Sequence, residues 1–369
     1  MLIPSLIFKK LIYYCYDDCV FGYLFGCYMS NKIPSFVIVG QVDSGKSSTC
    51  GHLLYLTKYI NDHEMNKIKI ECDKDKMARA IFARLLDIYD EEKIKGKTHE
   101  YQLIEFNYNG KPYELIDTPG HKSFIRSMIT GLFQKKSSEL IGCLIVSALK
   151  GEFEAGFGNG QTREDIVLLR AIGISRVIVL VNKMDTVGWD RGVYDDLVGR
   201  LDKFIRRLKF KKVVYLPLSA FYGTGLISVE GLPSWYTGKS FIDTLSDLND
   251  MSVAEIDSSS EEKNDMLFKT SEIMVQFNIL NSQLITVGYS GMCHYSGGEI
   301  NYIISRILTI NDKNFIPLKN CIAKTEDKMM AILNLDYEIL ISKNSKLLFR
   351  DREQTVGFGK ILKIKPSSK

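Results

Sequence analysis

The sequence predicts an α/β fold with a mostly parallel sheet between residues 34 and 250. Four near-continuous apolar runs lie at residues 36–39, 141–146, 177–181 and 213–218. Helical patterns at residues 122–133, 162–172 and 194–208 alternate with the later runs. Apolar strands that alternate with helices are typical of a parallel sheet covered on both faces, whose ligands bind at the carboxyl ends of the strands.

The first apolar run is followed by residues 40–47 (GQVDSGKS), which open a helical pattern through Leu53, Leu54 and Leu56. This order of strand, glycine-containing loop and helix predicts a phosphate-binding loop. Its backbone N–H groups and the positive end of the helix favour the phosphates of a nucleotide. Lys46 is expected to supply positive charge to the phosphates, and the Ser47 hydroxyl to coordinate Mg²⁺.

A hairpin is predicted after a helical segment at residues 61–95. Residues 101–108 and 113–116 have the composition of strands, and Asn109-Gly110 between them suits a tight turn. The second strand ends in Asp117-Thr118-Pro119-Gly120-His121. An acidic group at a strand end, followed by a turn with glycine, can hold the Mg²⁺ shell and sense a γ-phosphate.

Polar residues follow the last two predicted strands. They are Asn182-Lys183-Met184-Asp185 and Ser219-Ala220. The Asp185 carboxylate can accept from the ring N–H and the exocyclic amine of guanine, a donor pair that adenine lacks. The N–H of Ala220 can donate to the guanine O6, and the Lys183 stem can lie along the base. Asn and Asp are also common in turns, so the four elements in order, more than any one, predict a GTP site.

Composition sets broad limits on the chain. Its 369 residues are 45% hydrophobic and 25% charged, with a net charge of +4. These values predict two or three folded domains, and they permit a nucleic-acid or ribosomal partner without arguing for one. The eight cysteines include no CxxC pair or zinc-type spacing, which indicates reduced thiols in a cytosolic protein.

Residues 1–32 form an apolar N-terminal extension rich in aromatic side chains. A signal peptide is disfavoured because Lys9 and Lys10 follow the first apolar run, and a membrane span is disfavoured by Asp17 and Asp18. The preferred interpretation is a poorly ordered extension, or one outside the native protein if translation begins at Met29.

Several longer motifs resemble the elongation factor 1-alpha branch of translational GTPases, which includes the release-factor and ribosome-rescue GTPases. They are GQVDSGKSS, DTPGHKSFIRSMITG (residues 117–131), GEFEAGFGNGQTRED (residues 151–165) and NKMD. Near the C-terminus, residues 283–306 and 350–357 resemble the last β-barrel of that family. The resemblance implies a P-loop GTPase domain with an all-β barrel domain after it.

The family's middle β-barrel is missing from this sequence. The expected organisation is a GTP-binding domain at residues 33–249, a flexible Ser- and acid-rich linker at 250–269 and the barrel at 270–369. In relatives that deliver aminoacyl-tRNA, the absent barrel helps to hold the aminoacyl end. The resemblance therefore does not predict a working tRNA carrier, and tRNA stays an open partner.

The resemblance also assigns roles in hydrolysis. His121 takes the place of the residue that positions the attacking water, and Asp43 that of an acid near the bridging oxygen. Thr98 aligns with the threonine that closes on Mg²⁺, so Ser47, Thr98 and Asp117 (through water) are the expected metal ligands. Lys97 replaces an apolar residue that screens the water in relatives, and a lysine cannot form the same dry gate.

The expected contacts to the nucleotide come from every motif above. They are Gly40, Gln41, Val42, Asp43, Ser44, Gly45, Lys46, Ser47, Ser48, Asp117, Thr118, Pro119, Gly120, His121, Asn182, Lys183, Met184, Asp185, Ser219, Ala220 and Phe221.

The resulting hypothesis is a monomeric cytoplasmic GTPase that hydrolyses GTP with Mg²⁺, slowly until a ribosome or a translation or release factor aligns the site. No DNA or membrane partner is expected. An alternative hypothesis is a GTP-dependent regulator or decoy on ribosomes or release factors with little catalysis of its own, favoured by the missing barrel and Lys97. Sulfate-activating enzymes share this domain, but nothing in the sequence resembles their partner-specific features.

Overall fold

The computed structural model describes residues 33–74, 81–82, 102–117, 140–158, 160–256, 266–280, 284–311, 322–343, 345–351 and 354–365. Residues 34–369 belong to one compact unit. The extension predicted at residues 1–32 and the helix predicted at 122–133 lie outside the described residues.

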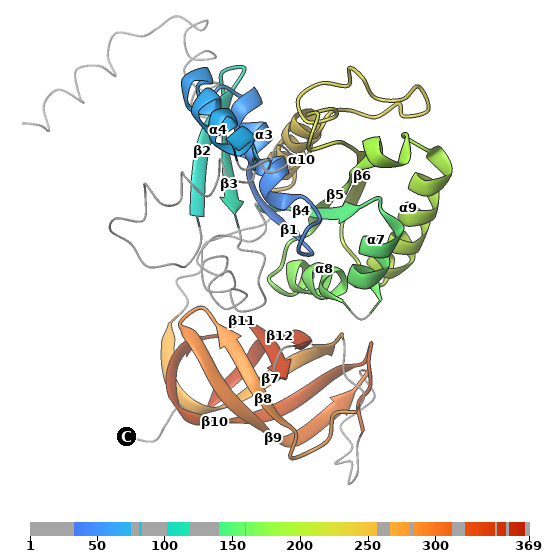
Figure 1. The fold of residues 1–369 in the computed structure, drawn as a ribbon. Helices are drawn as coiled ribbons and strands as arrows, with labels where there is room; N and C mark the ends of the chain where they lie inside the picture. The colour runs from blue at the N-terminus through green and yellow to red at the C-terminus, as the bar shows by residue number, and fades with distance from the viewer. Residues whose placement is uncertain are drawn as a thin grey trace, which may run out of the picture. The chain divides into compact units, whose positions relative to one another are not determined.

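The first domain is built on a six-stranded sheet in the order β2-β3-β1-β4-β5-β6 (Figure 1). All neighbours are parallel except β2 and β3, which form an antiparallel hairpin. This arrangement confirms the predicted α/β fold. The strands are β1 (Ser35–Gly40), β2 (Gln102–Tyr108), β3 (Lys111–Asp117), β4 (Leu140–Ser147), β5 (Arg176–Asn182) and β6 (Lys212–Pro217).

Helices cover both faces of this sheet, which together with them is called the sheet domain. The side chains of α3, α4 and α10 form one buried cluster with the sheet, and those of α7, α8 and α9 form another. The helices are α3 (Lys46–Leu56), α4 (Asp62–Lys74), α7 (Lys150–Phe157), α8 (Gln161–Ala171), α9 (Arg191–Ile205) and α10 (Phe241–Ile256), with the 3₁₀ turns η3 (Met184–Val187) and η4 (Arg206–Leu208).

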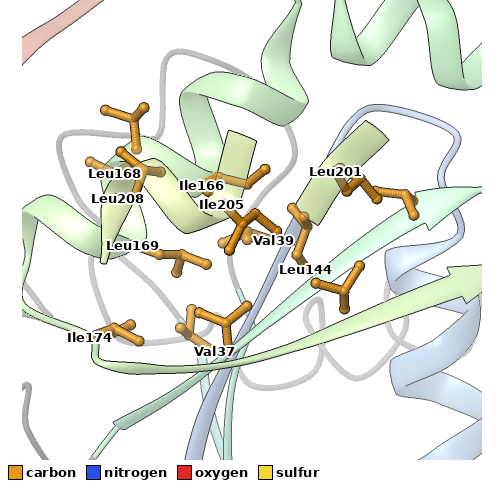
Figure 2. Packing of buried hydrophobic residues seen from close by; sticks show 14 of the residues in the cluster. Val37, Val39, Leu144, Ile166, Leu168, Leu169, Ile174, Leu201, Ile205 and Leu208 are labelled. Atoms are coloured by element: carbon orange, nitrogen blue, oxygen red, sulfur yellow. The ribbon is translucent and has the colours of Figure 1, made fainter. Parts of the chain in front are cut away.

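Strand β1 shows why the predicted strands are so apolar. Phe36 and Ile38 belong to the cluster with α3 and α10, whereas Val37 and Val39 belong to the cluster with α8 and α9. Successive side chains of a strand point to opposite faces, so a strand buried on both faces needs an unbroken apolar run. Figure 2 shows Val37, Val39 and Leu144 among side chains from the second cluster.

The predicted hairpin is present with its turn at Asn109-Gly110. Both turn residues have positive φ, 49° and 76°, as a tight two-residue hairpin turn requires. Strand β3 begins at Lys111, two residues before the predicted start, because Lys111 and Pro112 pair with Tyr108 and Asn107. The cross-strand pairing therefore extends up to the turn.

The elements on either side of the predicted linker extend into it. Helix α10 continues to Ile256 and strand β7 begins at Leu267, so the segment expected as linker from Asp250 to Lys269 overlaps both elements. Its first residues, Met251 to Glu255, include good helix formers that extend a helix already anchored by buried Leu245 and Leu248. Only residues 257–266 separate α10 from β7, too few for an inserted barrel.

The second domain is a closed antiparallel barrel, here called the barrel domain, with strand order β10-β7-β12-β11-β8-β9. Pairing of β9 with β10 closes it. Alternate residues of β7, from Ile273 to Ile279, point into its core, and Phe277 stacks on Phe349 with ring centroids 3.9 Å apart. The strands are β7 (Leu267–Ile279), β8 (Ser290–Tyr295), β9 (Gly298–Ile310), β10 (Lys328–Ser342), β11 (Lys346–Asp351) and β12 (Gln354–Lys365).

Helix α8 of the sheet domain contacts the barrel domain. The Glu164 carboxylate accepts from the N–H of Thr355 at 2.8 Å and also from its hydroxyl. Arg350 approaches the same carboxylate at 3.8 Å, and the Arg170 guanidinium lies 5.5 Å from the ring centroid of Phe358. The motif at residues 350–357, predicted from resemblance, is thus the part of the barrel that meets α8.

We expect Leu144→Ala to lower the free energy of unfolding by about 2–5 kcal/mol, because Leu144 is fully buried between the sheet and its helices. Urea unfolding followed by tryptophan fluorescence measures this, since Trp189 and Trp235 both lie in the sheet domain. The control Val229→Ala, at a side chain 52% exposed, should change stability by less than about 0.5 kcal/mol. Equal losses in the two variants would contradict the core assignment.

Candidate nucleotide-binding site

The phosphate loop connects β1 to α3 in a backbone conformation that glycine makes possible. Gly40 has φ 152° and Gly45 has φ 95°. A Cβ at Gly40 would lie 2.4 Å from the Ile145 carbonyl oxygen, and one at Gly45 would lie 2.2 Å from the Asn182 amide nitrogen. Asp43 adopts φ 65°, which Asp tolerates better than most residues. The predicted loop therefore forms as a tight turn between strand and helix.

Lys46 is the cation of this loop and is nearly buried. Its Nζ donates to the carbonyl oxygens of Gly40 at 2.6 Å and Gln41 at 2.8 Å. These bonds hold a positive charge under the loop at the start of α3, where helix N–H groups also favour an anion. The next residue, Ser47, is exposed, and Ser48 is half-buried. Val42 and Asp43 at the loop tip are exposed too.

Asn182, the last residue of β5, joins the phosphate loop to the loop after β6. Its Nδ2 donates to the Ser44 carbonyl at 2.9 Å, and its Oδ1 accepts from the Ala220 N–H at 2.8 Å. The side chain is 2% exposed, so both bonds lie in a poorly solvated environment where they are hard to replace. Three segments predicted separately from sequence thus converge on one amide.

The residues after Asn182 form the turn η3. Lys183 adopts φ 65°, the N–H of buried Met184 donates to the Leu218 carbonyl, and Asp185 is half-buried in the turn. The Lys183 ammonium pairs with the Glu152 carboxylate of α7 at 2.6 Å. Burial raises the pKa of Glu152, but hydrogen bonds from Lys183 and Ser147 outweigh it and the pKa is lowered. Glu152 therefore stays charged and holds the lysine.

The loop after β6 contains Ser219, Ala220 and Phe221. The Ser219 N–H donates to the Thr224 carbonyl at 3.1 Å, and its hydroxyl accepts from the Tyr222 N–H at 3.3 Å. Ala220 is buried, and Phe221 is 42% exposed. The loop is thereby closed into a compact turn with one apolar ring at its surface.

His52 of α3 supports this loop and was not predicted from sequence. Its Nδ1 lies 2.7 Å from the Ala220 carbonyl oxygen, so Nδ1 carries the proton and donates. The ring stacks on Phe82 at 3.8 Å, and burial lowers the pKa of His52, which keeps the imidazole neutral. A buried histidine in the helix that follows a phosphate loop was the only available signal, and on its own it is ordinary core composition.

The side of the site expected to meet the γ-phosphate is described in part. Asp117 is the last residue of β3 and pairs with Ile38, two residues before the phosphate loop begins. Thr98, Thr118, Pro119, Gly120 and His121 lie outside the described residues, as does Lys97. Their predicted roles are neither supported nor contradicted by the structure.

No three His, Cys, Asp or Glu side chains in the described part of the chain gather as a metal-binding group. Among the described helices, none combines the length and apolarity needed to span a bilayer.

The fold and the converging loops define a P-loop nucleotide-binding domain. The chain belongs to the family described as the elongation factor Tu GTP binding domain, whose model matches residues 31–285. The family resemblance predicted from the motifs is confirmed.

Curated relatives include translation factors. Elongation factor 1-alpha of Aeropyrum pernix is 37% identical over 219 residues, which are 58% of this chain and 49% of that protein. The peptide chain release factor GTP-binding subunit of Kluyveromyces lactis is 36% identical over 223 residues, covering 58% of this chain and 31% of that protein. The chain thus matches about half or less of the length of each of these two relatives.

Among solved structures, the GTPase-like domain of S. cerevisiae Ski7 bound to GTP has a TM-score of 0.70 and 14% identity. The match covers 89% of this chain and 96% of that chain. At this identity the likeness concerns the fold alone. It extends over both the sheet domain and the barrel domain.

We expect His52→Phe to weaken GDP binding by up to about tenfold. The ring stack on Phe82 is kept, but the buried Ala220 carbonyl loses its donor, which costs about 1–3 kcal/mol at that loop. Titration with a fluorescent GDP analogue gives the Kd. The control His63→Phe changes an exposed histidine of α4 and should leave the Kd unchanged. A His52→Phe protein that binds within twofold of the unmodified chain would show that the contact does not position the loop.

Proposed function

We propose that this chain binds GTP with Mg²⁺, hydrolyses it to GDP and phosphate, and acts as a molecular switch in translation. The observation that carries the proposal is the Asn182 amide, which joins the phosphate loop to the loop expected to contact the base. A site that only bound phosphate would need the first loop alone. Family membership supports GTP as the nucleotide.

Base selection is assigned to Asp185, with the Ala220 N–H and the Lys183 stem. The Asp185 carboxylate accepts from the two adjacent N–H donors of guanine. Glu152 supports this role indirectly, since its ion pair fixes the ammonium of Lys183, which precedes the turn that carries Asp185. Met184, Ser219 and Phe221 complete the proposed base-contacting surface.

Phosphate binding is assigned to residues 40–48, with Lys46 as the cation. An oxygen-ligand site for Mg²⁺ is supported by the exposed Ser47 in the first turn of α3 and by the strand ending at Asp117, which runs beside β1. Ser47 and Thr98, with Asp117 through water, would hold the ion, which would neutralise charge on the β- and γ-phosphates. Thr118, Pro119 and Gly120 form the proposed γ-phosphate turn.

Hydrolysis is assigned to His121, which would orient the attacking water, with Asp43 as a secondary acid. Phosphoryl transfer is catalysed mainly by positioning and charge stabilisation, so a site whose parts are incompletely aligned turns over slowly. The proposal therefore includes a partner that aligns it. The translation factors among the relatives support a ribosome or a translation or release factor as that partner, in the cytoplasm.

A second candidate function is a GTP-dependent regulatory module with little catalysis. The short connection of residues 257–266 favours it, because no middle barrel stands between α10 and β7 to hold a cargo. The domain division that we propose, with a GTP-binding domain to about residue 256 and a barrel from 267, is common to both candidates. The rate of GTP hydrolysis with a partner present distinguishes the two candidates.

We expect Asp185→Ala to weaken GDP binding roughly a hundredfold, since two hydrogen bonds to a charged acceptor are lost at about 1.5 kcal/mol or more each. Displacement assays with GDP, XDP and ADP measure this. Asp185→Asn should move the preference toward XDP, whose C2 carbonyl accepts from an amide. The control Asp195→Ala, an exposed carboxylate on α9, should change nothing. Equal binding of ADP and GDP by the unmodified chain would refute the guanine assignment.

We expect His121→Ala to keep GDP affinity within about threefold and to lose most partner-stimulated hydrolysis, because the residue acts on the water and not on the bound nucleotide. Phosphate release is measured in single turnover, with and without purified ribosomes. A rate in the unmodified chain that ribosomes do not raise would favour the regulatory module. A His121→Ala rate equal to that of the unmodified chain with ribosomes would contradict the role of His121.

A further inference from the structure

Asp165 is a buried carboxyl group directly beneath the phosphate loop. It belongs to α8 (Gln161–Ala171) and is 5% exposed. The Gly40 N–H hydrogen-bonds to it from the loop, and the charge of Lys46 acts on it. The proposed function gives it no role. Its position makes it part of the support of the loop.

The hydrogen bonds of this carboxyl are incomplete. Its Oδ2 atom is buried and has no hydrogen-bond partner among the described residues. An ionised carboxylate with a dry, unpartnered oxygen is costly, whereas the protonated acid carries no net charge into that environment. Burial, helped by the nearby Glu164 charge, raises the pKa of Asp165 to about 7 against the opposing effects of the Lys46 charge and the Gly40 N–H.

Among the described residues, Lys46 and Glu164 are the charged groups that act on Asp165, and Glu164 has a cationic neighbour of its own. Lys46 belongs to the phosphate loop, Glu164 to the same helix, and Arg350 of the barrel domain faces Glu164 at 3.8 Å. Lys46 is the group that Asp165 shares with the nucleotide. Two loop carbonyls at 2.6 and 2.8 Å fix its ammonium within the phosphate loop, where its charge also acts on Asp165.

We propose that Asp165 is a positioning residue for Lys46 and that guanine nucleotides bind preferentially to the form in which Asp165 is protonated. Phosphates bound by this loop would place several negative charges near Lys46 and Asp165. They repel an ionised carboxylate and engage the cation that would otherwise stabilise it. Protonation of Asp165 therefore favours nucleotide binding, and nucleotide binding favours protonation of Asp165. This inference rests on the proposed function, because it concerns the same phosphate site.

The sign of the pH dependence follows from this linkage. If the nucleotide complex holds the Asp165 proton more tightly than the free protein does, the complex binds more protons near neutral pH. Affinity is then constant below about pH 6, where both forms are protonated, and falls as pH rises through 7. For each unit by which bound nucleotide raises the pKa of Asp165, the Kd at high pH is about tenfold larger than the Kd at low pH.

The test is Asp165→Asn, which keeps the shape of the side chain and an acceptor for the Gly40 N–H but cannot ionise. The Kd for GDP is measured from pH 5.5 to 8.5 for both proteins. Titration of the nucleotide phosphates affects both proteins equally, so it cancels in the ratio of their two Kd values. We expect equal affinities at pH 5.5 and a three- to tenfold tighter Asp165→Asn complex at pH 8.5, by the linkage above. The control Asp195→Asn should follow the unmodified chain throughout.

A second measurement uses only the unmodified chain, so it does not depend on whether the variant folds. Calorimetry of GDP binding to the unmodified chain at pH 7.5, in buffers of different ionisation enthalpy, should show net proton uptake beyond that of the nucleotide. A constant Kd ratio across the pH range, or no such uptake, would overturn the inference while GDP binding itself remained intact. Failure to bind GDP at every pH would instead overturn the proposed function.

Discussion

The side-chain amide of Asn182 is the contact on which the site depends. It bonds to Ser44, 138 positions earlier in the chain, and to Ala220, 38 positions later. An amide offers one acceptor and one donor group, and here each is used on a different loop. The parallel register makes this possible, because Ser147 and Asn182 are paired at the carboxyl edge where β1 also ends at Gly40. The sheet brings the loops to one edge, and Asn182 fixes their separation.

Around that contact, helices α7 and α8 support the turn after β5 and the phosphate loop, respectively. Glu152 of α7 binds Lys183, and Asp165 of α8 lies under Gly40. Ser44 Oγ and Asp165 Oδ2 are buried at the loop without hydrogen-bond partners among the described residues. Orphaned polar atoms are uncommon in folded interiors and concentrate where function requires them. Their position indicates that the loop and its support are arranged for a ligand as well as for stability.

Much of the fold follows from local sequence patterns. The strands β4 and β5 were predictable because burial on both faces requires unbroken apolar runs. Asn109-Gly110 identified the hairpin because few residue pairs take two positive φ values. The loop residues and Asn182 followed from motif order. The end of α10 was missed because its polar composition resembles a linker, while its helical state depends on the anchored turns before it.

The supporting residues were not predictable, because their roles exist only in three dimensions. His52 contacts a carbonyl 168 positions away, and nothing local distinguishes it from a core histidine. Glu152 and Asp165 are ordinary acids in helical sequence until the fold places one beside Lys183 and the other beside Lys46. Long-range pairing of this kind leaves no periodicity in the chain. Sequence therefore predicted the loops that meet at Asn182 far better than the residues that hold those loops in place.

Helix α8 connects these supports to the second domain through two consecutive residues. Glu164 accepts from the backbone and side chain of Thr355 in the barrel domain, and Asp165 accepts from the backbone of Gly40 in the phosphate loop. Neighbouring positions on a helix point about 100° apart, so one turn can face two partners at once. Within a helix the backbone hydrogen bonds fix the distance between adjacent residues. The barrel domain and the phosphate loop are therefore tied to the same rigid turn, and a displacement of that turn alters both contacts together.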